Sequence, residues 1–376
     1  MREFQVCTRC VMDTTDSQIT FNEDGVCDHC ISFDQSIKPN WPSGEDAKIK
    51  LESLVDEIKK EGEGNDFDCI IGMSGGIDSS YLTYRAKELG LKPLVFHVDA
   101  GWNSQVAVNN IEKLIDNLNL DLHTEVINWR EMRDLQLAYF KSGLPNIDTP
   151  QDHAFFATMY KFAQKYNVKN ILTGANLSTE CIRNPLEWMY YQSDSVQLKD
   201  IHNKFGEEEL KSFPITSILN HKIFLPYFRG IRVRKPLDLM DYDKKEAMNL
   251  LKEKFGWIPY PQKHFESRFT RFYEGYWLLR RFGYDTRKVQ FSSLILTNQM
   301  TRKEALKELE SPPLTENEIN LEFDFVCNKL EISRDELKTY FNLPKRKNNE
   351  FKSQSWIYSL GAFLMKTMRL EIGGKR

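Results

Sequence analysis

Short apolar runs alternate with amphipathic stretches from about residue 66 onward. Four of the runs have the length and composition of strands, at residues 67–73, 93–99, 123–127 and 170–176. Helical spacing of apolar positions follows three of them, near residues 81–89, 104–118 and 150–166. This alternation predicts an α/β fold with a mostly parallel sheet and helices on both faces. Ligands bind such sheets at the carboxyl ends of the strands. The segments expected to converge there are 74–80, 97–102 and 173–180.

The chain on either side of this region has a different pattern. Pro39, Pro42 and Gly44 indicate a linker, and a charged amphipathic helix is expected near 46–60. Beyond about residue 240 the strand signals fade. Two sequences typical of capping boxes, TRKE at 301–304 and SRDE at 333–336, indicate helix starts. We therefore expect four parts, at residues 1–35, 36–65, 66–240 and 241–376, and the last is expected to be mainly helical.

Composition narrows the class of protein. The chain has 376 residues, 41% of them hydrophobic, and a formal net charge of −3. A charge this close to zero argues against a surface built mainly to bind nucleic acid. No apolar run approaches the length of a membrane span, and the first residues lead into cysteines rather than into a signal sequence. We expect a cytoplasmic protein without a membrane span.

Two CxxC pairs lie near the start of the chain. Cys7 and Cys10 form the first, and Cys27 and Cys30 form the second after sixteen intervening residues. This spacing is typical of a zinc ribbon, in which four thiolates bind Zn²⁺ tetrahedrally. Such a closed site has a structural role. The alternative is a pair of redox or incidental motifs, and His29 is expected to be a bystander.

The sequence SGGIDSS, at residues 74–80, separates the first predicted strand from the first predicted helix. Gly75 and Gly76 permit a sharp turn and the close approach of an anion. Ser79 and Ser80 stand at the helix start, where free N–H groups and the helix dipole favour phosphate. It is not a Walker A loop, because no Gly-Lys-Ser/Thr follows. An ordinary strand-to-helix turn is the alternative.

A basic, aromatic stretch extends from Lys263 to Lys288. It contains seven Lys or Arg residues against three Asp or Glu, with aromatic residues interleaved. Such a stretch suits an anionic ligand with a ring, for example a nucleotide or nucleotide sugar, and could also bind single-stranded RNA. The alternative is an aromatic helix core with a solvated basic face. A second basic group follows the same reasoning and comprises Arg229, Arg232, Arg234 and Lys235.

SGGIDSS resembles the PP-loop of the ATP pyrophosphatase superfamily, whose fold is of the adenine nucleotide alpha hydrolase-like type. The resemblance implies that ATP is cleaved between its α and β phosphates with Mg²⁺ and that a substrate oxygen is adenylated. It implies catalytic roles for Ser74, Asp78 and Ser79. Contacts to phosphate are implied for Ser74, Gly75, Gly76, Ser79 and Ser80. A helix cap is the alternative for Asp78.

Residues at the other strand ends complete the expected ATP site. His97 and Asp99 end a strand where adenine or ribose would lie, although His97 could equally be a packed strand residue. Gly174 is expected to allow close approach of the nucleotide. Glu180 follows on the same loop and is expected to hold Mg²⁺ or a substrate group, with a solvated surface residue as the alternative.

The motifs together resemble one family of PP-loop enzymes, the N-acetyl sugar amidotransferases of the WbpG and PseA type in surface-polysaccharide and flagellar-glycan synthesis. The carrying sequences are CTRCVMDTTD at 7–16, GVCDHC at 25–30, SGGIDSS at 74–80, TGANLSTE at 173–180 and KHFESRFTRFYEGYWLLRRFGYDTRK at 263–288. The resemblance implies adenylation of the N-acetyl oxygen of a nucleotide-linked sugar, followed by attack of ammonia from a separate glutaminase. Expected contacts to sugar or phosphate are Lys263, His264, Glu266 and Arg271.

Two other functions remain open at the level of sequence. A tRNA 2-thiolation enzyme also joins zinc cysteines to a PP-loop, and it usually needs a reactive cysteine pair. Cys69 and Cys181 flank the predicted ATP site and could form one. A non-catalytic zinc-ribbon scaffold is the third possibility, and the intact SGGIDSS sequence argues against it.

Overall fold

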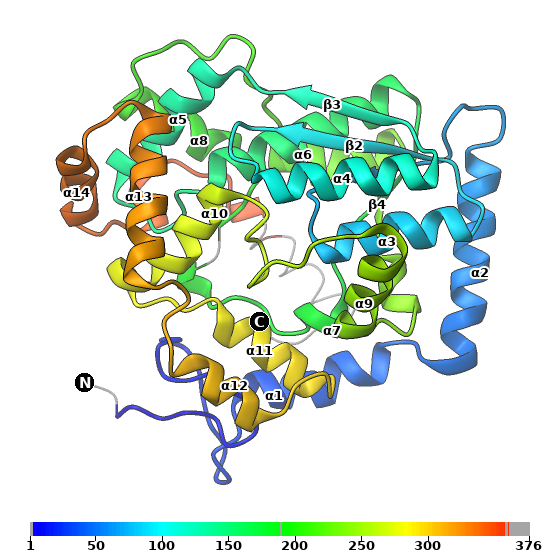
Figure 1. The fold of residues 1–376 in the computed structure, drawn as a ribbon, viewed down its shortest axis with the longest axis horizontal. Helices are drawn as coiled ribbons and strands as arrows, with labels where there is room; N and C mark the ends of the chain where they lie inside the picture. The colour runs from blue at the N-terminus through cyan, green and yellow to red at the C-terminus, as the bar shows by residue number, and fades with distance from the viewer. Residues whose placement is uncertain (1–2, 189, 358–359, 361–376) are drawn as a thin grey trace.

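A computed structural model describes residues 3–188, 190–357 and 360. Its centre is a five-stranded sheet in the order β3-β2-β1-β4-β5, and every neighbouring pair is parallel (Figure 1). The strands are β1 Cys69–Gly72, β2 Pro93–Asp99, β3 Leu122–Val126, β4 Asn170–Leu172 and β5 Arg232–Arg234. The predicted α/β class with a parallel sheet is confirmed.

The position of β1 decides where a ligand can bind. From β1 the chain moves outward through β2 to β3, and then returns to β4 and β5 on the other side of β1. The strand order therefore reverses between β1 and β4. A crevice forms outside the carboxyl ends of the strands at such a switch point. The loop 74–76 follows β1 directly, so it lies at this point.

Two hydrophobic cores cover the two faces of the sheet. Ile70 of β1 belongs to one core, and its neighbours Cys69 and Ile71 belong to the other, as the two-residue period of a strand requires. The first core includes side chains of α5 Trp129–Ser142, α6 Thr149–Lys165 and α8 Ser195–Phe205. The second includes side chains of α2 Gly44–Glu61, α3 Ile77–Glu88, α4 Gln105–Leu118 and α9 Lys244–Phe255. Burial on both faces explains why the predicted strands are almost continuous apolar runs.

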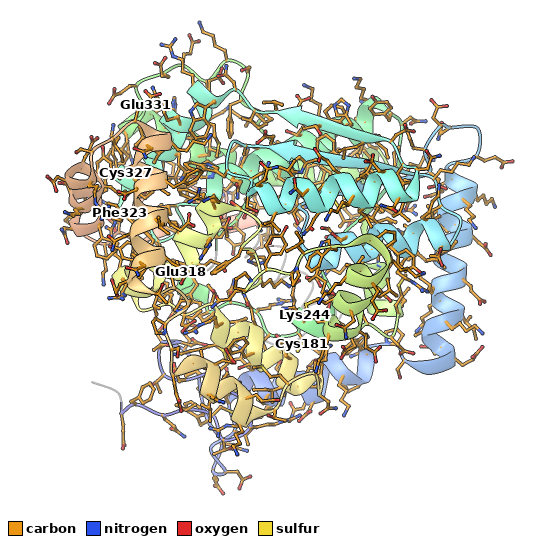
Figure 2. All side chains as sticks on the ribbon, in the orientation of Figure 1. Cys181, Lys244, Glu318, Phe323, Cys327 and Glu331 are labelled. Atoms are coloured by element: carbon orange, nitrogen blue, oxygen red, sulfur yellow. The ribbon has the colours of Figure 1, made fainter. Side chains whose placement is uncertain are left out.

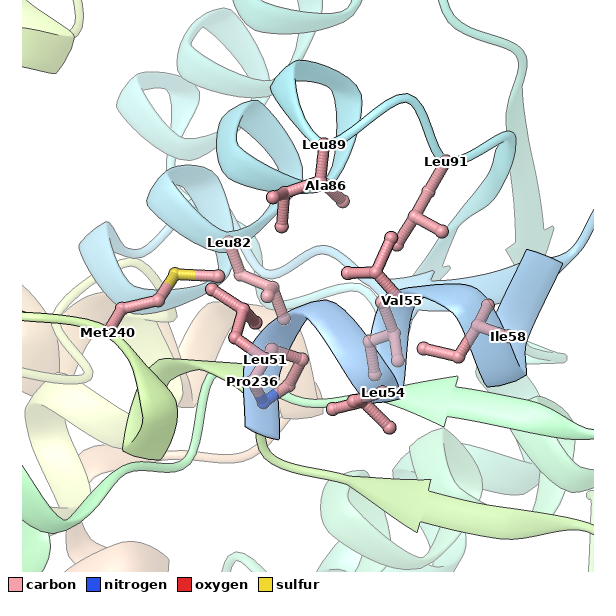
Figure 3. A pocket seen from close by; sticks show the side chains of 11 residues that line it. Leu51, Leu54, Val55, Ile58, Leu82, Ala86, Leu89, Leu91, Pro236 and Met240 are labelled. Atoms are coloured by element: carbon pink, nitrogen blue, oxygen red, sulfur yellow. The ribbon is translucent and has the colours of Figure 1, made fainter. Parts of the chain in front are cut away.

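A small cavity of about 10 Å³ lies in the second core, between α2 and α3 (Figure 3). Its lining consists of hydrocarbon side chains such as Leu51, Val55 and Leu82, together with Pro236 and Met240. It lacks polar groups that could orient a ligand, and we treat it as a packing defect.

The C-terminal part is helical, as predicted. Its helices are α10 Arg268–Phe272, η6 Tyr273–Phe282, α11 Arg287–Leu296, α12 Arg302–Leu309, α13 Glu316–Leu330 and α14 Arg334–Asn342. Thr301 and Glu304 form the predicted reciprocal capping box of α12. Ser333 caps α14 by accepting the Glu336 N–H. A further box, Thr315 with Glu318, opens α13 and was not predicted.

Helix α5 and strand β5 were also not predicted from the sequence. The buried face of α5 carries Glu131, Asp134 and Gln136, which hide its amphipathic pattern. Glu131 accepts backbone N–H groups from Ser212 and Phe213, so its burial is compensated. Strand β5 is a three-residue edge strand with two arginines. Neither segment resembles an independent apolar element.

The first 40 residues fold around the cysteines, but without the two regular arms of a ribbon. Two isolated bridges, Val6–Asp13 and Phe21–Cys27, take their place. Three helical turns follow: α1 Asp28–Ser32, η1 Phe33–Ile37 and η2 Lys38–Asn40. The remaining short helices are α7 Leu177–Glu180, η3 Leu186–Trp188, η4 Asn220–Phe228, η5 Pro236–Leu239 and η7 Asn348–Glu350. Within the described residues, no helix is both long and apolar enough to cross a membrane.

Candidate active site and cysteine centre

The four predicted zinc ligands meet at one point. Cys7, Cys10, Cys27 and Cys30 are fully buried, and their sulfurs all lie within 4.8 Å of one another. Three of the Sγ–Sγ distances are 3.6, 3.6 and 3.9 Å. Four sulfurs held tetrahedrally at about 2.3 Å from a zinc ion would lie about 3.8 Å apart. The donor set and its spacing therefore fit Zn²⁺.

Backbone groups support the same assignment. The N–H groups of Arg9, Cys10 and Cys27 each point to Cys7 Sγ at 3.3–3.4 Å. Such contacts stabilise thiolate charge and orient metal ligands. The Arg302 guanidinium of α12 donates to the carbonyl oxygens of Cys7 and Cys10, at 2.8 and 3.0 Å. A residue almost 300 positions away thus stabilises the first CxxC turn.

The sequence CVMDTTD, which follows the first pair, binds to the C-terminal helices. The Val11 N–H donates to Ser292 Oγ at 3.1 Å. The Lys288 ammonium lies 2.5 Å from Asp13 Oδ2, and Asp13 is almost fully buried. His29 bonds to Asp16 at 2.9 Å and takes no part in the sulfur cluster, so its prediction as a bystander agrees with the geometry.

The SGGIDSS loop makes a sharp turn from β1 into α3. Gly75 has φ +82°, and a Cβ atom there would lie 2.9 Å from the Ala107 carbonyl oxygen. Its own carbonyl accepts from Trp257 Nε1 at 3.3 Å and from the Tyr260 hydroxyl at 3.2 Å. The next residue, Gly76, is the N-cap of α3 and has no side chain to satisfy the helix N-terminus. The loop is therefore fixed in shape while the helix start lacks a side-chain cap.

Asp78 is the most strongly held residue of the loop. Its carboxylate lies 3.1 Å from Lys263 Nζ and accepts from the Tyr242 hydroxyl at 2.5 Å and from Asn176 Nδ2 at 3.4 Å. Burial opposes ionisation, but Lys263, the Tyr242 hydroxyl and Lys244 together outweigh it and hold the pKa of Asp78 below its ordinary value. These side-chain partners lie outside the start of α3, so the geometry does not favour the alternative of a helix cap.

Two lysines place positive charge beside the loop. Lys263 bridges Asp78 and Glu180, with Glu180 Oε1 2.6 Å from the ammonium. Lys244 lies at the start of α9 (Figure 2). Among the described residues, its ammonium has no hydrogen bond or ion pair. Burial lowers the pKa of Lys244, and Asp78 partly offsets that effect. These lysines are suited to an anionic ligand.

Glu266 connects the loop with the basic, aromatic stretch. Ser74 Oγ donates to Glu266 Oε1 at 3.1 Å and lies 3.3 Å from Ser79 Oγ. The Glu266 carbonyl accepts the Ser104 N–H at 2.9 Å. This arrangement brings the predicted catalytic serines, Asp78, Glu180, Lys263 and Glu266 together at one sheet edge. We call the set Ser74, Asp78, Ser79, Glu180, Lys244, Lys263 and Glu266 the loop site.

His97 and Asp99 lie near the carboxyl end of β2, and both make hydrogen bonds within the protein rather than belonging to the loop. His97 is buried, with Nδ1 2.7 Å from the Met73 carbonyl and Nε2 3.0 Å from Asn103 Nδ2. Both ring nitrogens are thus used within the protein, as expected for a packed strand residue. Asp99 Oδ1 accepts from the Gly101 N–H at 2.8 Å. Their predicted contacts to adenine or ribose stay predictions.

Gly174 and Ser80 have surroundings that sequence could not show. A Cβ atom at Gly174 would lie 2.8 Å from the Asp78 carbonyl carbon and 2.9 Å from the Ser79 nitrogen. The group that approaches this glycine is therefore the loop backbone itself. The Ser80 hydroxyl is completely buried, unlike those of Ser74 and Ser79. Contacts from Gly174 and Ser80 to a nucleotide stay predictions.

Most of the basic stretch is paired inside the protein, which agrees with the alternative of a structural helix face. Arg271, a predicted substrate contact, pairs with Glu318 and Glu322 of α13, and Arg268 also pairs with Glu322. Arg280 pairs with Glu316, and Arg281 donates to the carbonyls of Tyr340 and Leu343. Arg287 pairs with Asp285, and Lys288 pairs with Asp13. Arg232 and Arg234 pair with Glu57 of α2. Lys263 and His264 are the members that face the loop site and its neighbourhood.

Sequence reasoning missed Lys244 of the loop site. It also missed three residues that bond to the loop from outside the site, namely Asn176, Tyr242 and Trp257. Asn176 lies inside the quoted sequence TGANLSTE and was a recognisable candidate. The other three come from a segment whose apolar pattern indicates only a helix. Lys244 follows the α9 N-cap Asp243, and this position at a helix start gave no signal of a binding role.

The comparisons first define a class. Residues 266–365 match the family model described as "LPS biosynthesis protein WbpG-like, C-terminal domain". The match begins at Glu266, the residue that bonds to the loop, and its last part lies outside the described residues. The chain therefore joins a PP-loop sequence on a parallel sheet to a WbpG-like C-terminal domain. The resemblance to the WbpG type is confirmed for this part.

One curated protein and three solved structures are similar to larger parts of the chain. A tRNA-specific 2-thiouridylase from Fusobacterium nucleatum is 23% identical over 217 residues, which are 54% of this chain and 60% of that protein. This chain thus spans less than two thirds of the relative's length. Three solved structures are similar, at 13–17% identity and TM-scores of 0.29–0.30. The match to NMN synthetase from Francisella tularensis covers 57% of this chain and 88% of that chain. The match to NH3-dependent NAD synthetase from Campylobacter jejuni covers 80% of this chain and 99% of that chain. The match to the U34-tRNA thiolase NcsA from Methanococcus maripaludis covers 70% of this chain and 80% of that chain.

Proposed function

We propose that this protein is an ATP-dependent amidotransferase that converts the N-acetyl group of a nucleotide-linked sugar into an acetamidino group for surface polysaccharide or flagellar glycan. One observation carries the proposal. Glu266, the first residue of the WbpG-like domain, accepts a hydrogen bond from Ser74 of the loop. The domain that resembles sugar-modifying proteins therefore supplies part of the loop site.

The proposed reaction has two steps. The N-acetyl oxygen attacks the α phosphorus of ATP, the bond to the β-phosphate oxygen breaks, and pyrophosphate leaves. Ammonia then attacks the activated carbon, the carbon–oxygen bond to AMP breaks, and a proton of the ammonia passes to the departing phosphate. Adenylation is needed because an amide oxygen is a poor leaving group by itself.

Residues of the loop site have clear tasks in this scheme. The α3 N-terminus and the hydroxyls of Ser74 and Ser79 can donate to phosphate oxygens. Lys244 and Lys263 can offset the charge that develops on them. Asp78 and Glu180 offer the carboxylate oxygens that Mg²⁺ prefers, and bound Mg²⁺ would supply charge neutralisation at the phosphates. The cysteine centre would hold a structural Zn²⁺.

The proposed ammonia donor is a separate glutaminase. The exposed apolar side chains at the end of η4 support a protein partner, because such patches mark interaction sites. Tyr227 and Phe228 of η4 are 81% and 73% exposed. Val126 at the end of β3 is 71% exposed and belongs to the lining of a separate cavity of about 470 Å³, together with Ile215 and Asn220 among others. It opens at the carboxyl end of β3, at the same sheet edge as the loop.

Product analysis tests the reaction. The protein is incubated with ATP, ammonium and a panel of UDP- and CMP-linked N-acetyl sugars. Release of AMP and pyrophosphate is expected only with the matching sugar, and mass spectrometry should show oxygen replaced by NH. Sugar-independent release of AMP, or release that needs tRNA and a sulfur donor, would refute the proposal.

Charge placed on the apolar surface tests the partner. Tyr227→Glu and Phe228→Glu should abolish turnover with glutamine and the host's glutaminase but leave turnover with free ammonium intact. Leu321→Glu, at an exposed leucine on α13, is the matched control and should affect neither. Equal activity of all three variants with glutamine would locate the partner elsewhere.

A tRNA 2-thiolation enzyme is the second candidate, favoured by the similarity to the thiouridylase. The candidate cysteine pair gives it no support. Cys69 lies at the amino end of β1 in the second core, and Cys181 packs with the cysteine centre. Burial raises the pKa of Cys181 to about 11, and burial and Asp68 raise that of Cys69 well above its usual value. Reactive thiols need the opposite shift.

A further inference from the structure

A second group of polar side chains lies beside the loop site, and none of its contacts belongs to that site. Its members are Asp148, Asp152, Tyr190, His264, Tyr273 and Glu274, which we call the acid–tyrosine cluster. They come from four separate segments: the start of α6, the stretch before α8, the segment before α10, and the start of η6. We propose that this cluster binds the hydroxyl-rich sugar ring of the acceptor substrate. This inference rests on the proposed function and assigns a site to its substrate.

The five-residue segment 263–267 places the cluster next to the loop. Lys263 bonds to Asp78 of the loop, whereas His264 Nδ1 lies 3.0 Å from Glu274 Oε1 in the cluster. Glu266 and Ser267 divide in the same way, with one bonded to the loop and the other linked to the cluster. Glu266 accepts from Ser74, and Ser267 Oγ donates to Gln151, whose amide donates to Asp148. A substrate that spans the segment would therefore contact both sites.

Tyr273 offers the cluster a hydroxyl that the described part of the chain does not use. Its residue is 5% exposed, and Asp148, Asp152 and Glu274 act on it electrostatically. Its hydroxyl makes no hydrogen bond within the described residues. A ligand hydroxyl can therefore donate to it or accept from it.

The mixture of donors and acceptors identifies the ligand class. The Thr270 hydroxyl and the Gln151 amide donate to the two oxygens of Asp148, at 2.7 and 3.3 Å. The Tyr190 hydroxyl donates to Asp152 Oδ2, so Asp152 has its other oxygen to offer. Burial and mutual repulsion raise the pKa of Asp148, and burial raises that of Asp152. Hydroxyl groups both donate and accept, and they match such a set. A phosphate would be repelled by the carboxylates.

A cation is the competing ligand, and His264 argues against it. Partial desolvation works against protonation of the exposed His264 ring, but Glu274 raises its pKa to about 9, so the ring is cationic at neutral pH. A cation would be placed beside this charge. The cluster therefore favours a neutral, polyhydroxylated ring.

Two conservative variants test the assignment with kinetics of AMP formation. Tyr273→Phe and Asp152→Asn are expected to raise KM for the sugar nucleotide about tenfold each, the loss of one hydrogen bond, while KM for ATP stays unchanged. Tyr276→Phe is the matched control on the same helix, because its ring packs on Phe341 and it contacts no cluster residue. Thermal unfolding confirms that each variant is folded.

The outcomes separate the two proposals. If the wild-type protein forms AMP with a sugar nucleotide but both variants keep its KM, the cluster is not the sugar site and the proposed function survives. If KM for ATP rises as much as KM for the sugar, the cluster serves the loop and the inference is wrong. If no sugar nucleotide supports AMP formation by the wild-type protein, both proposals fail. If the KM for ammonium rises in the variants while the KM for the sugar nucleotide stays unchanged, the cluster is a cation site and the inference is wrong.

Discussion

The cysteine centre and the loop site are assembled in opposite ways. All four ligands of the cysteine centre come from 24 consecutive residues, and their sulfurs point at one another in a closed, buried set. The loop site draws on residues from 74 to 266, and Lys244 and the α3 N-terminus have no side-chain partner in the part of the chain that the structure describes. A closed donor set suits a permanent metal ion, whereas unsatisfied groups suit a ligand that comes and goes.

The difference also concerns what each site depends on. The cysteine centre depends on its own covalent spacing, and a single lost ligand should remove the metal. The loop site depends on the packing of a distant domain, because Lys263 and Glu266 hold Asp78 and Ser74 from outside the sheet. Four substitutions test this contrast.

The largest effect is expected at the cysteine centre. Cys27→Ser should abolish the binding of one zinc per chain and unfold the first 40 residues, because structural zinc stabilises small modules by about 10 kcal/mol. Metal analysis and limited proteolysis measure both changes. Cys327→Ser, at another buried cysteine, should keep the zinc. Unchanged zinc in the Cys27 variant would mean that the four sulfurs do not bind it.

Asp78→Asn is expected to act on chemistry rather than on metal content. Loss of the carboxylate should slow AMP formation about 10²–10³-fold, the usual range for one electrostatic group of an active site. Zinc content should stay at one per chain. Asp116→Asn, at an exposed position on α4, is the control. A variant that fails to fold would show that the Asp78–Lys263 pair is mainly structural.

A smaller effect is expected from Lys244. Lys244→Met removes the free ammonium and should raise KM for ATP about tenfold with little change in kcat, since one charge-assisted contact is worth roughly 1.5 kcal/mol or more. Steady-state kinetics at varied ATP concentration measure it. Lys245→Met, one residue further and exposed, should behave as the wild type. Equal kinetics for both variants would leave Lys244 without a role in binding.

The smallest effect is a pH dependence of stability at His264. Its folded pKa, about 9, exceeds the ordinary value of 6.5, so the pairing with Glu274 stabilises the protein fully below pH 6.5 and is lost as the pH rises through 9. Because the side chain is 45% exposed, solvent screening keeps this contribution below about 1 kcal/mol. Denaturant unfolding of the wild type and of His264→Asn should converge above pH 9. A constant difference from pH 6 to pH 10 would exclude the pairing as its source.

Sequence predicted best what lies close together in the chain. The strand, glycine turn and helix around residues 69–88 and the four cysteines follow from local spacing, and the structure has them at these positions. The basic stretch shows the limit. Its charge is neutralised in part by Glu316, Glu318 and Glu322 of α13, which lie 36 to 54 residues from the arginines they pair with. Only the packing of α13 against α10 reveals that these arginines are paired rather than free.

The hydrogen bonds from Arg302 to the Cys7 and Cys10 carbonyls have a consequence for how the chain is made. The cysteines are synthesised before Arg302, Ser292 and Lys288. Domains fold as they emerge from the ribosome, but this one cannot complete its packing until synthesis has passed residue 302. The N-terminal residues therefore reach their final packing late in synthesis. If synthesis stopped before residue 288, the N-terminal residues would lack the C-terminal helices on which they pack.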